Sequence, residues 1–179
     1  MLDVKVKSSV SIMSNFPKIG EPAPNFAAKN QKGETVSLSD FNAQWLVLYF
    51  YPKDNTPGCT TEAIDFTHHQ AEFDALGATI IGVSPDSEKS HCKFIEKHHL
   101  SLQLISDEDH QVAEAYGVWG LKKFMGKEYM GIIRSTFLID PDGKVAETWT
   151  KVKVKNHVEG VLNKLQELKG NSQQTLGYP

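Results

Sequence analysis

The sequence has few cysteines, a single arginine and no long apolar run. Its 179 residues include two cysteines, Cys59 and Cys92, which are too few for a disulfide scaffold, so we expect a reducing, cytoplasmic compartment. No apolar stretch approaches the roughly 20 residues of a membrane-spanning helix, and we read no secretory signal in residues 1–15. A formal net charge of -3 gives no reason to expect nucleic acid or an anionic membrane as a partner.

The pattern of apolar residues predicts one α/β domain with a mixed central sheet flanked by helices. We assign residues 16–170 to this domain, 1–15 to a flexible N-terminal extension and 171–179 to a flexible tail. Runs rich in apolar residues predict strands, and helical spacing or capping residues predict helices. Strands are expected at 45–50, 78–84, 102–105, 135–140 and 144–149, and helices at 60–76, 87–98, 109–116 and 156–170.

Cys59 stands at the predicted start of a helix, directly after a Pro- and Gly-containing loop. A thiol at this position meets unpaired N–H groups and the positive end of the helix dipole, which favour the thiolate form. Pro52 and Pro57 stiffen the loop, and Thr56 can place its hydroxyl beside the sulfur. A lone cysteine is more often a small buried apolar residue, and Thr56 could simply cap the helix. The surrounding sequence favours a reactive cysteine.

Arg134 is the single arginine of the chain and directly precedes a predicted strand. Its fixed fork of donors suits an anionic sulfur or a peroxide oxygen. A role as a surface salt-bridge partner remains open at this point.

Taken together, these segments resemble the peroxiredoxins, and specifically the bacterioferritin-comigratory-protein/PrxQ subgroup. The similarity runs from about residue 17 to about residue 169, and the order and spacing of its motifs are highly specific. The motifs are Pro22-Ala23-Pro24-Asn25-Phe26, Tyr49-Phe50-Tyr51-Pro52, Thr56-Pro57-Gly58-Cys59-Thr60-Thr61-Glu62, Val83-Ser84-Pro85-Asp86, Leu104-Ile105-Ser106-Asp107, Tyr116-Gly117-Val118-Trp119-Gly120, Lys123-Phe124-Met125-Gly126-Lys127 and Arg134-Ser135-Thr136-Phe137-Leu138-Ile139-Asp140.

The resemblance implies a thioredoxin-like fold and the reduction of hydrogen peroxide and organic hydroperoxides. Cys59 would be the peroxidatic cysteine, oxidised by the peroxide to a sulfenic acid. Thr56 would hydrogen-bond the peroxide, Pro52 would shield the sulfenate, and Arg134 would hold the thiolate and stabilise the transition state.

Three further residues are assigned to substrate binding. The backbone of the loop, including Gly58, would point N–H groups inward, and Glu62 would support the hydrogen bonds of the site. Phe124 lies in a Gly-rich segment that we expect to be a loop. Its aromatic and Met residues are either ordinary core or an apolar wall of the peroxide pocket, and they are Trp119, Phe124, Met125 and Tyr129.

Cys92 is a possible resolving cysteine, by the same resemblance. Subgroup members carry this residue five positions after the peroxidatic cysteine, where this chain has Ile64, or in the next long helix, nearer Ile95. Cys92 is one helical turn from Ile95 and so shares its face. A Cys59–Cys92 disulfide after local unfolding and a one-cysteine enzyme both remain open. The implied reductant is thioredoxin or a similar dithiol protein, and the implied oligomeric state is a monomer.

Rival functions have weaker support. A cysteine hydrolase needs a histidine base on the sulfur, and no histidine lies in the segments around Pro52 or Arg134. A client-holding protein would need an exposed apolar stripe, which the sequence does not indicate. Neither metal nor organic cofactor is expected, because the paired residues His68-His69, His91-Cys92 and His98-His99 read as solvated helix faces.

Overall fold

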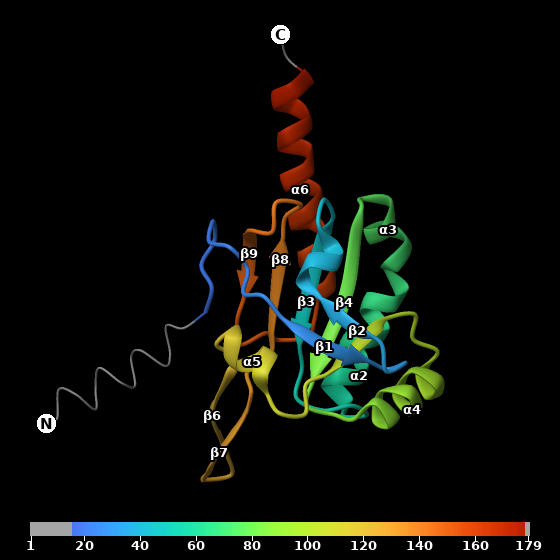
Figure 1. Ribbon diagram of the computed structural model, residues 1–179, viewed down its shortest axis with the longest axis vertical. Helices are drawn as coiled ribbons and strands as arrows, with labels where there is room; N and C mark the ends of the chain where they lie inside the picture. Colours follow the sequence, from blue (N-terminus) through green and yellow to red (C-terminus); the bar gives the residue numbers. More distant parts are fainter. Residues whose placement is uncertain (1–15, 178–179) are drawn as a thin grey trace, which may run out of the picture.

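The computed structural model describes residues 16–177 and shows a mixed α/β fold (Figure 1). A seven-stranded sheet has the order β2-β1-β5-β4-β3-β8-β9, and β6 and β7 form a separate hairpin. The predicted extension 1–15 lies outside the described residues. The elements are β1 Ala27–Asn30, β2 Thr35–Ser37, the 3-10 helix η1 Leu38–Phe41, β3 Trp45–Phe50, α2 Pro57–His68, α3 Gln70–Ala75, β4 Ala78–Ser84, α4 Glu88–His98, β5 Gln103–Ser106, α5 Gln111–Ala115, β6 Trp119–Phe124, β7 Lys127–Ile132, β8 Ser135–Ile139, β9 Val145–Trp149 and α6 His157–Gly177.

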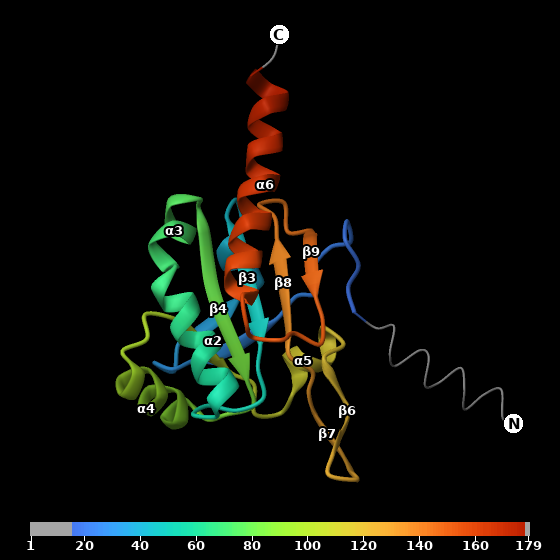
Figure 2. The ribbon, with the colours of Figure 1, turned by 180° about the vertical axis from the view of Figure 1, so that it is seen from behind.

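The central sheet has a separate apolar core on each face. Because side chains alternate across a strand, Val47 and Tyr49 of β3 pack into one core with residues of α2, α4 and α6. Leu48 and Phe50 of the same strand pack into the other core, beside α5. Figures 1 and 2 show α2, α3 and α6 on one side of the sheet and α5 on the other. The sheet is therefore buried on both faces, which explains the continuous apolar run of β3.

Strand directions bring two distant segments together at one edge of the sheet. Strands β3, β4 and β5 are parallel, so their carboxyl ends lie at the same edge. Strand β8 runs antiparallel to β3 and pairs Ser135 with Phe50. The residue before β8, Arg134, therefore starts beside the loop that follows β3. The chain between β3 and α2 and the chain entering β8 meet here.

Three expectations about local structure are wrong. The predicted helix 60–76 is divided at His69, which ends α2 and precedes α3. The last helix does not end at Gly170 but continues to Gly177. A side chain at Gly170 would meet nothing within 4 Å, and an isolated glycine lowers helix stability without ending the helix. The expected loop around Phe124 is the β6–β7 hairpin.

Among residues 16–177 no helix is long and apolar enough to span a membrane.

Candidate active site

Cys59 lies in the first turn of α2, where the sequence predicts it. Thr56 is the N-cap residue with extended backbone, and its carbonyl accepts the first helical hydrogen bond, from Thr60 N at 2.9 Å. Pro57 occupies the first helical position, where its missing N–H costs nothing. Cys59 is 1% exposed. The sulfur is thus held at the positive end of a 12-residue helix, in an almost dry environment.

Arg134 contacts the sulfur directly and is held by a buried carboxylate. Its Nη2 donates a hydrogen bond to Cys59 Sγ at 3.3 Å. Its Nη1 donates to Glu62 Oε1 at 2.7 Å. Glu62 lies one helical turn after Cys59 on the same face of α2 and is fully buried. The guanidinium therefore bridges the thiol and the carboxylate in one plane of donors, and the surface salt-bridge alternative for Arg134 is wrong.

The electrostatics of this trio follow from burial. Burial raises the pKa of Glu62 to about 7, although Arg134 opposes the shift. Burial alone would lower the pKa of Arg134, but Glu62 and Cys59 raise it further than burial lowers it. Arg134 is therefore a permanent cation at the sulfur. Glu62 Oε2 has no hydrogen-bond partner among the described residues, so the carboxylate depends on Arg134.

Gly58 has a steric reason to be glycine. A side chain there would bring Cβ within 3.2 Å of Arg134 Nη2 and 3.8 Å of Val154 Cγ2. The absence of a side chain lets the guanidinium approach the helix start, next to Cys59. The predicted substrate contact through the backbone of Gly58 stays a prediction.

Arg134 also lines a cavity of about 900 Å³, whose lining does not include Cys59 itself. Pro52 lines the same cavity, together with Trp119, Leu121 and Lys122 of the β6–β7 hairpin. Burial lowers the pKa of Lys122, and Arg134 adds to this shift. Lys123 and Lys151 also line the cavity, so a substrate in it would meet an apolar wall and four basic side chains. The sequence reasoning missed Lys122, because no local pattern marks a lysine that a hairpin turns toward an arginine elsewhere in the chain.

Thr56 and Phe124 differ in how well the structure suits their assigned roles. Thr56 does not cap the helix through its side chain; its hydroxyl instead donates to Lys53 O at 2.8 Å. Phe124 is 67% exposed near the end of the hairpin and is not among the residues that line the 900 Å³ cavity. Trp119, which the sequence analysis named with Phe124 as a possible pocket wall, does line this cavity, and so does Leu121, which it did not name.

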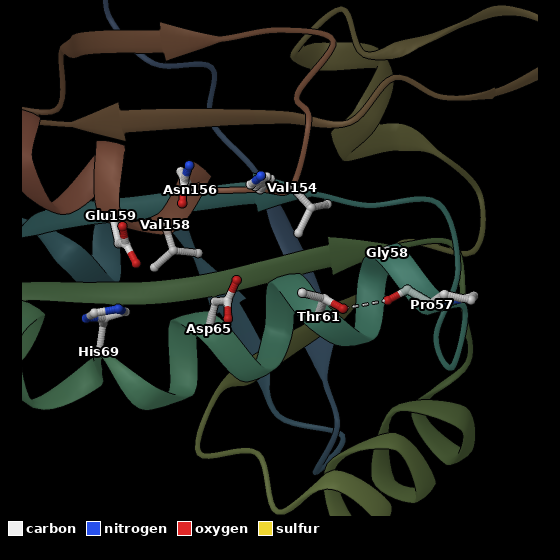
Figure 3. A pocket seen from close by; sticks show the side chains of 10 residues that line it. Pro57, Gly58, Thr61, Asp65, His69, Val154, Asn156, Val158 and Glu159 are labelled. Atoms are coloured by element: carbon white, nitrogen blue, oxygen red, sulfur yellow. Dashed lines mark hydrogen bonds between the residues drawn. The ribbon is translucent and has the colours of Figure 1, made fainter.

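A second cavity, of about 520 Å³, lies between α2 and the start of α6 and is also lined by Pro57 and Gly58, which directly precede Cys59. Asp65 of α2 and His69 at its C-cap lie opposite Asn156 and Glu159 around the start of α6, whereas the Thr61 hydroxyl donates to Pro57 O at 3.0 Å (Figure 3). Burial raises the pKa of Asp65, although His69 lowers it. Arg134 does not line this cavity, so we do not assign the reaction to it.

In the folded chain, Cys92 is not part of the cluster of Cys59, Arg134 and Glu62. Both cysteines are free; Cys59 is buried, whereas Cys92 is exposed on α4. The Cys92 thiol donates a hydrogen bond to Gln31 O at 3.0 Å, whereas Cys59 Sγ accepts a hydrogen bond from Arg134. A disulfide between them requires local rearrangement.

His91 and His157 are buried. The prediction that His91 lies on a solvated helix face is therefore wrong. His157 Nε2 is 2.8 Å from Thr136 Oγ1, and burial lowers its pKa to about 4, with a further contribution from Arg134. His91 lies with Asp54 and Asp86 in a group whose ligand atoms are within 4.8 Å of one another. These side chains already hydrogen-bond one another and the backbone. We therefore interpret the group as a hydrogen-bond network.

The site combines a buried cysteine at a helix start with an arginine, and the sulfur's hydrogen-bond partner among the described residues is this arginine rather than a histidine base. A guanidinium and backbone N–H groups stabilise an oxyanion leaving group, whereas acyl transfer needs a base. On a sheet of this topology, the arrangement defines a thiol peroxidase of thioredoxin-like fold.

Comparisons with known proteins agree. The family model described as AhpC/TSA matches residues 19–148. Peroxiredoxin Bcp of Bacillus subtilis is 56% identical over 151 residues, which are 84% of this chain and 96% of that protein. Peroxiredoxin Bcp of Escherichia coli K12 is 47% identical over 150 residues, 84% of this chain and 96% of that protein. The chain belongs to the AhpC/TSA family and is a peroxiredoxin of the Bcp/PrxQ type.

Solved structures give the same result. Peroxiredoxin Q of Xanthomonas campestris superposes with a TM-score of 0.76 at 45% identity, covering 79% of this chain and 90% of that one. PrxQ of Xylella fastidiosa, as a cysteine-to-serine mutant, gives a TM-score of 0.81 at 41% identity, covering 86% and 98%. The predicted thioredoxin-like fold is confirmed.

Proposed function

We propose that Cys59 is the peroxidatic cysteine and that Arg134, Thr56, Pro52 and the Gly58 backbone form the peroxide site around it. The observation that carries this assignment is the hydrogen bond from Arg134 Nη2 to the buried Cys59 sulfur. A permanent cation at this distance stabilises the thiolate before reaction and the negative charge that develops on the peroxide during reaction.

The reaction is a two-electron transfer from sulfur to peroxide. The Cys59 thiolate attacks one peroxide oxygen, the O–O bond breaks, and the other oxygen leaves with the bonding pair as hydroxide or alkoxide. The leaving oxygen takes up a proton and departs as water or alcohol. The sulfur becomes a sulfenic acid. Arg134, already placed at the sulfur, needs no reorganisation to stabilise the leaving group.

The cavity supports organic hydroperoxides as substrates besides hydrogen peroxide. Trp119, Leu121 and Val152 give it an apolar lining next to Arg134. One of the Xanthomonas campestris structures is described as giving insight into the alkyl peroxide reduction activity of that bacterium's bacterioferritin comigratory protein. An alkyl chain in the cavity of this chain would contact the hairpin while its hydroperoxide group reaches Arg134.

Thr56→Val should slow the reaction with peroxide about tenfold without changing the intrinsic reactivity of the thiol. The hydroxyl proton of Thr56 goes to Lys53 O, which leaves the oxygen to accept a hydrogen bond from the peroxide. Valine has nearly the same shape and cannot accept. The measurement is the second-order rate constant of Cys59 oxidation by hydrogen peroxide, with iodoacetamide alkylation as the reference reaction. Thr56→Ser is the matched control and should react nearly as the wild type; equal rates for Val and Ser would remove Thr56 from the site.

Recycling requires a thiol, and we assign this role to Cys92 followed by a thioredoxin-like dithiol protein. The Cys92 thiol attacks the Cys59 sulfenic acid, a disulfide forms and water leaves; the dithiol protein then reduces the disulfide and is itself oxidised. Both thiols are free, and Cys92 is exposed. Because Cys59 is buried, the start of α2 must open before the two sulfurs meet.

One equivalent of hydrogen peroxide should remove both free thiols and lower the mass of the intact chain by about 2 Da, the mass of two hydrogen atoms, without forming dimers. The measurement is intact mass spectrometry with thiol counting before and after oxidation. Loss of one thiol with added oxygen would make this a one-cysteine enzyme and remove the role of Cys92. Two unchanged thiols would contradict the peroxidatic role of Cys59.

Two further properties stay proposals. An exposed free thiol on α4 suits a reducing compartment, and we place the enzyme in the cytoplasm. We propose that it acts as a monomer, as the resemblance to the Bcp/PrxQ subgroup implies.

A further inference from the structure

The loop between β3 and α2 is anchored by Asp54, a buried carboxylate that does not line the 900 Å³ cavity. Asp54 is 5% exposed. Its Oδ1 accepts a hydrogen bond from Tyr51 OH at 2.6 Å. Its Oδ2 accepts from Ser90 Oγ at 2.8 Å and lies 2.8 Å from His91 Nδ1. Ser90 and His91 belong to α4, so the side chain of one loop residue is held mainly by another helix.

The contact between Asp54 and His91 is short and enclosed. Asp54 Oδ2 lies 2.8 Å from His91 Nδ1, and His91 Nε2 lies 3.0 Å from Ile105 O on the other side of the ring. A carbonyl oxygen only accepts, so Nε2 donates to it and holds the ring in place. His91 is fully buried, and a buried polar group that loses its hydrogen-bond partner costs free energy.

The backbone of the same loop is fixed from a second side. Asp54 N donates to Asp86 Oδ2 at 2.8 Å, and Ser84 Oγ donates to the same oxygen at 2.6 Å. Asn55 has a φ of 62, and its Oδ1 lies 3.2 Å from His98 Nε2 on α4. The loop is therefore tied both to the end of β4 and to α4.

We propose that Asp54 is a positioning residue of the peroxidase. By clamping the loop to α4 it holds Pro52 and Thr56, its neighbours two residues before and two residues after, in place around the thiol. The proposal rests on the function proposed above for these two residues. Arg134 enters from β8 and contacts Cys59 independently of the clamp. Loss of the clamp should therefore disturb the geometry of the peroxide and spare the reactivity of the thiol.

Asp54→Asn tests this division. Asparagine keeps the size of the side chain but replaces one oxygen with an NH₂ group, which cannot accept the hydrogen bonds that the carboxylate receives from Tyr51 or Ser90. Two rate constants are measured from acid to neutral pH: oxidation of Cys59 by hydrogen peroxide and its alkylation by iodoacetamide. We expect oxidation to slow about tenfold, as for a misplaced catalytic group, with alkylation and its pH profile unchanged. Asp74→Asn, on the exposed side of α3, is the matched control and should leave both rates unchanged.

Two results would overturn the proposal. If both rates fall equally in Asp54→Asn, the residue supports the start of α2 as a whole; if neither falls, it has no positioning role. Should Asp54→Asn lose its cooperative thermal transition, Ser90→Ala replaces it as the test. This variant removes one hydrogen bond and keeps the contact between Asp54 and His91, and we expect a drop of about twofold to threefold in oxidation alone. Failure of the peroxidase assignment is distinguishable, because the wild-type thiol would then not react with peroxide at all.

Discussion

Replacement of Cys59 by serine is expected to abolish peroxide turnover. The thiolate supplies both the nucleophile and the two electrons that reduce the peroxide. A serine hydroxyl is not ionised at neutral pH, and its oxygen cannot be oxidised to an equivalent of the sulfenic acid. Turnover should fall at least about a thousandfold, to the uncatalysed background, as it does when a nucleophile is removed from other enzymes. The measurement is peroxide consumption with excess dithiol reductant.

The matched control is Cys92→Ser, which makes the same chemical change at the exposed cysteine on α4. This variant should keep the wild-type rate of Cys59 oxidation, because Cys92 contacts Gln31 O and not the peroxide site. Turnover with a small thiol in place of the dithiol protein should also persist. The opposite pattern, with turnover lost in Cys92→Ser and kept in Cys59→Ser, would move the nucleophile to Cys92.

Much of the site could be predicted because its signals are local. An apolar strand, a loop with Pro57 and Gly58 and a helix with apolar spacing lie next to one another in the sequence, so the place of Cys59 needs no tertiary information. Arg134 was identifiable because the chain has no other arginine. Its distance from Cys59 depends on the pairing of β8 with β3, which no local pattern contains. Glu62 follows from helical periodicity once Cys59 is placed.

The errors concern residues whose environment is set by distant parts of the chain. His91 was assigned to a solvated face, although Phe94 one turn later on α4 is fully buried. Its ring enters a network with Asp54 from another segment, which no local pattern contains. The β6–β7 hairpin was missed because both of its faces expose apolar residues, so the usual alternation is absent. Its exposed Phe124 was chosen for its type and its motif rather than for its direction.

Arg134→Ala is expected to slow oxidation of Cys59 about a hundredfold, the effect of removing a principal donor to a developing oxyanion. It should also slow alkylation at neutral pH, because the cation that favours the thiolate is gone. This pattern differs from that expected for Thr56→Val, in which alkylation is unchanged. The two reactions measured together therefore separate activation of the thiol from positioning of the peroxide. Unchanged alkylation in Arg134→Ala would contradict the assigned contact with sulfur.

Removal of Arg134 also changes the protonation of Glu62, so Arg134→Ala needs a control at Glu62. Burial already raises the pKa of Glu62 to about 7 with Arg134 present; without the cation its pKa rises further, and the carboxyl becomes protonated at neutral pH. The double variant Arg134→Ala/Glu62→Gln should therefore react like Arg134→Ala, since a protonated carboxyl and an amide are both neutral. Arg134→Lys keeps the charge but cannot bond Cys59 and Glu62 with one planar fork. It should regain only part of the rate, and full recovery with lysine would show that a point charge suffices.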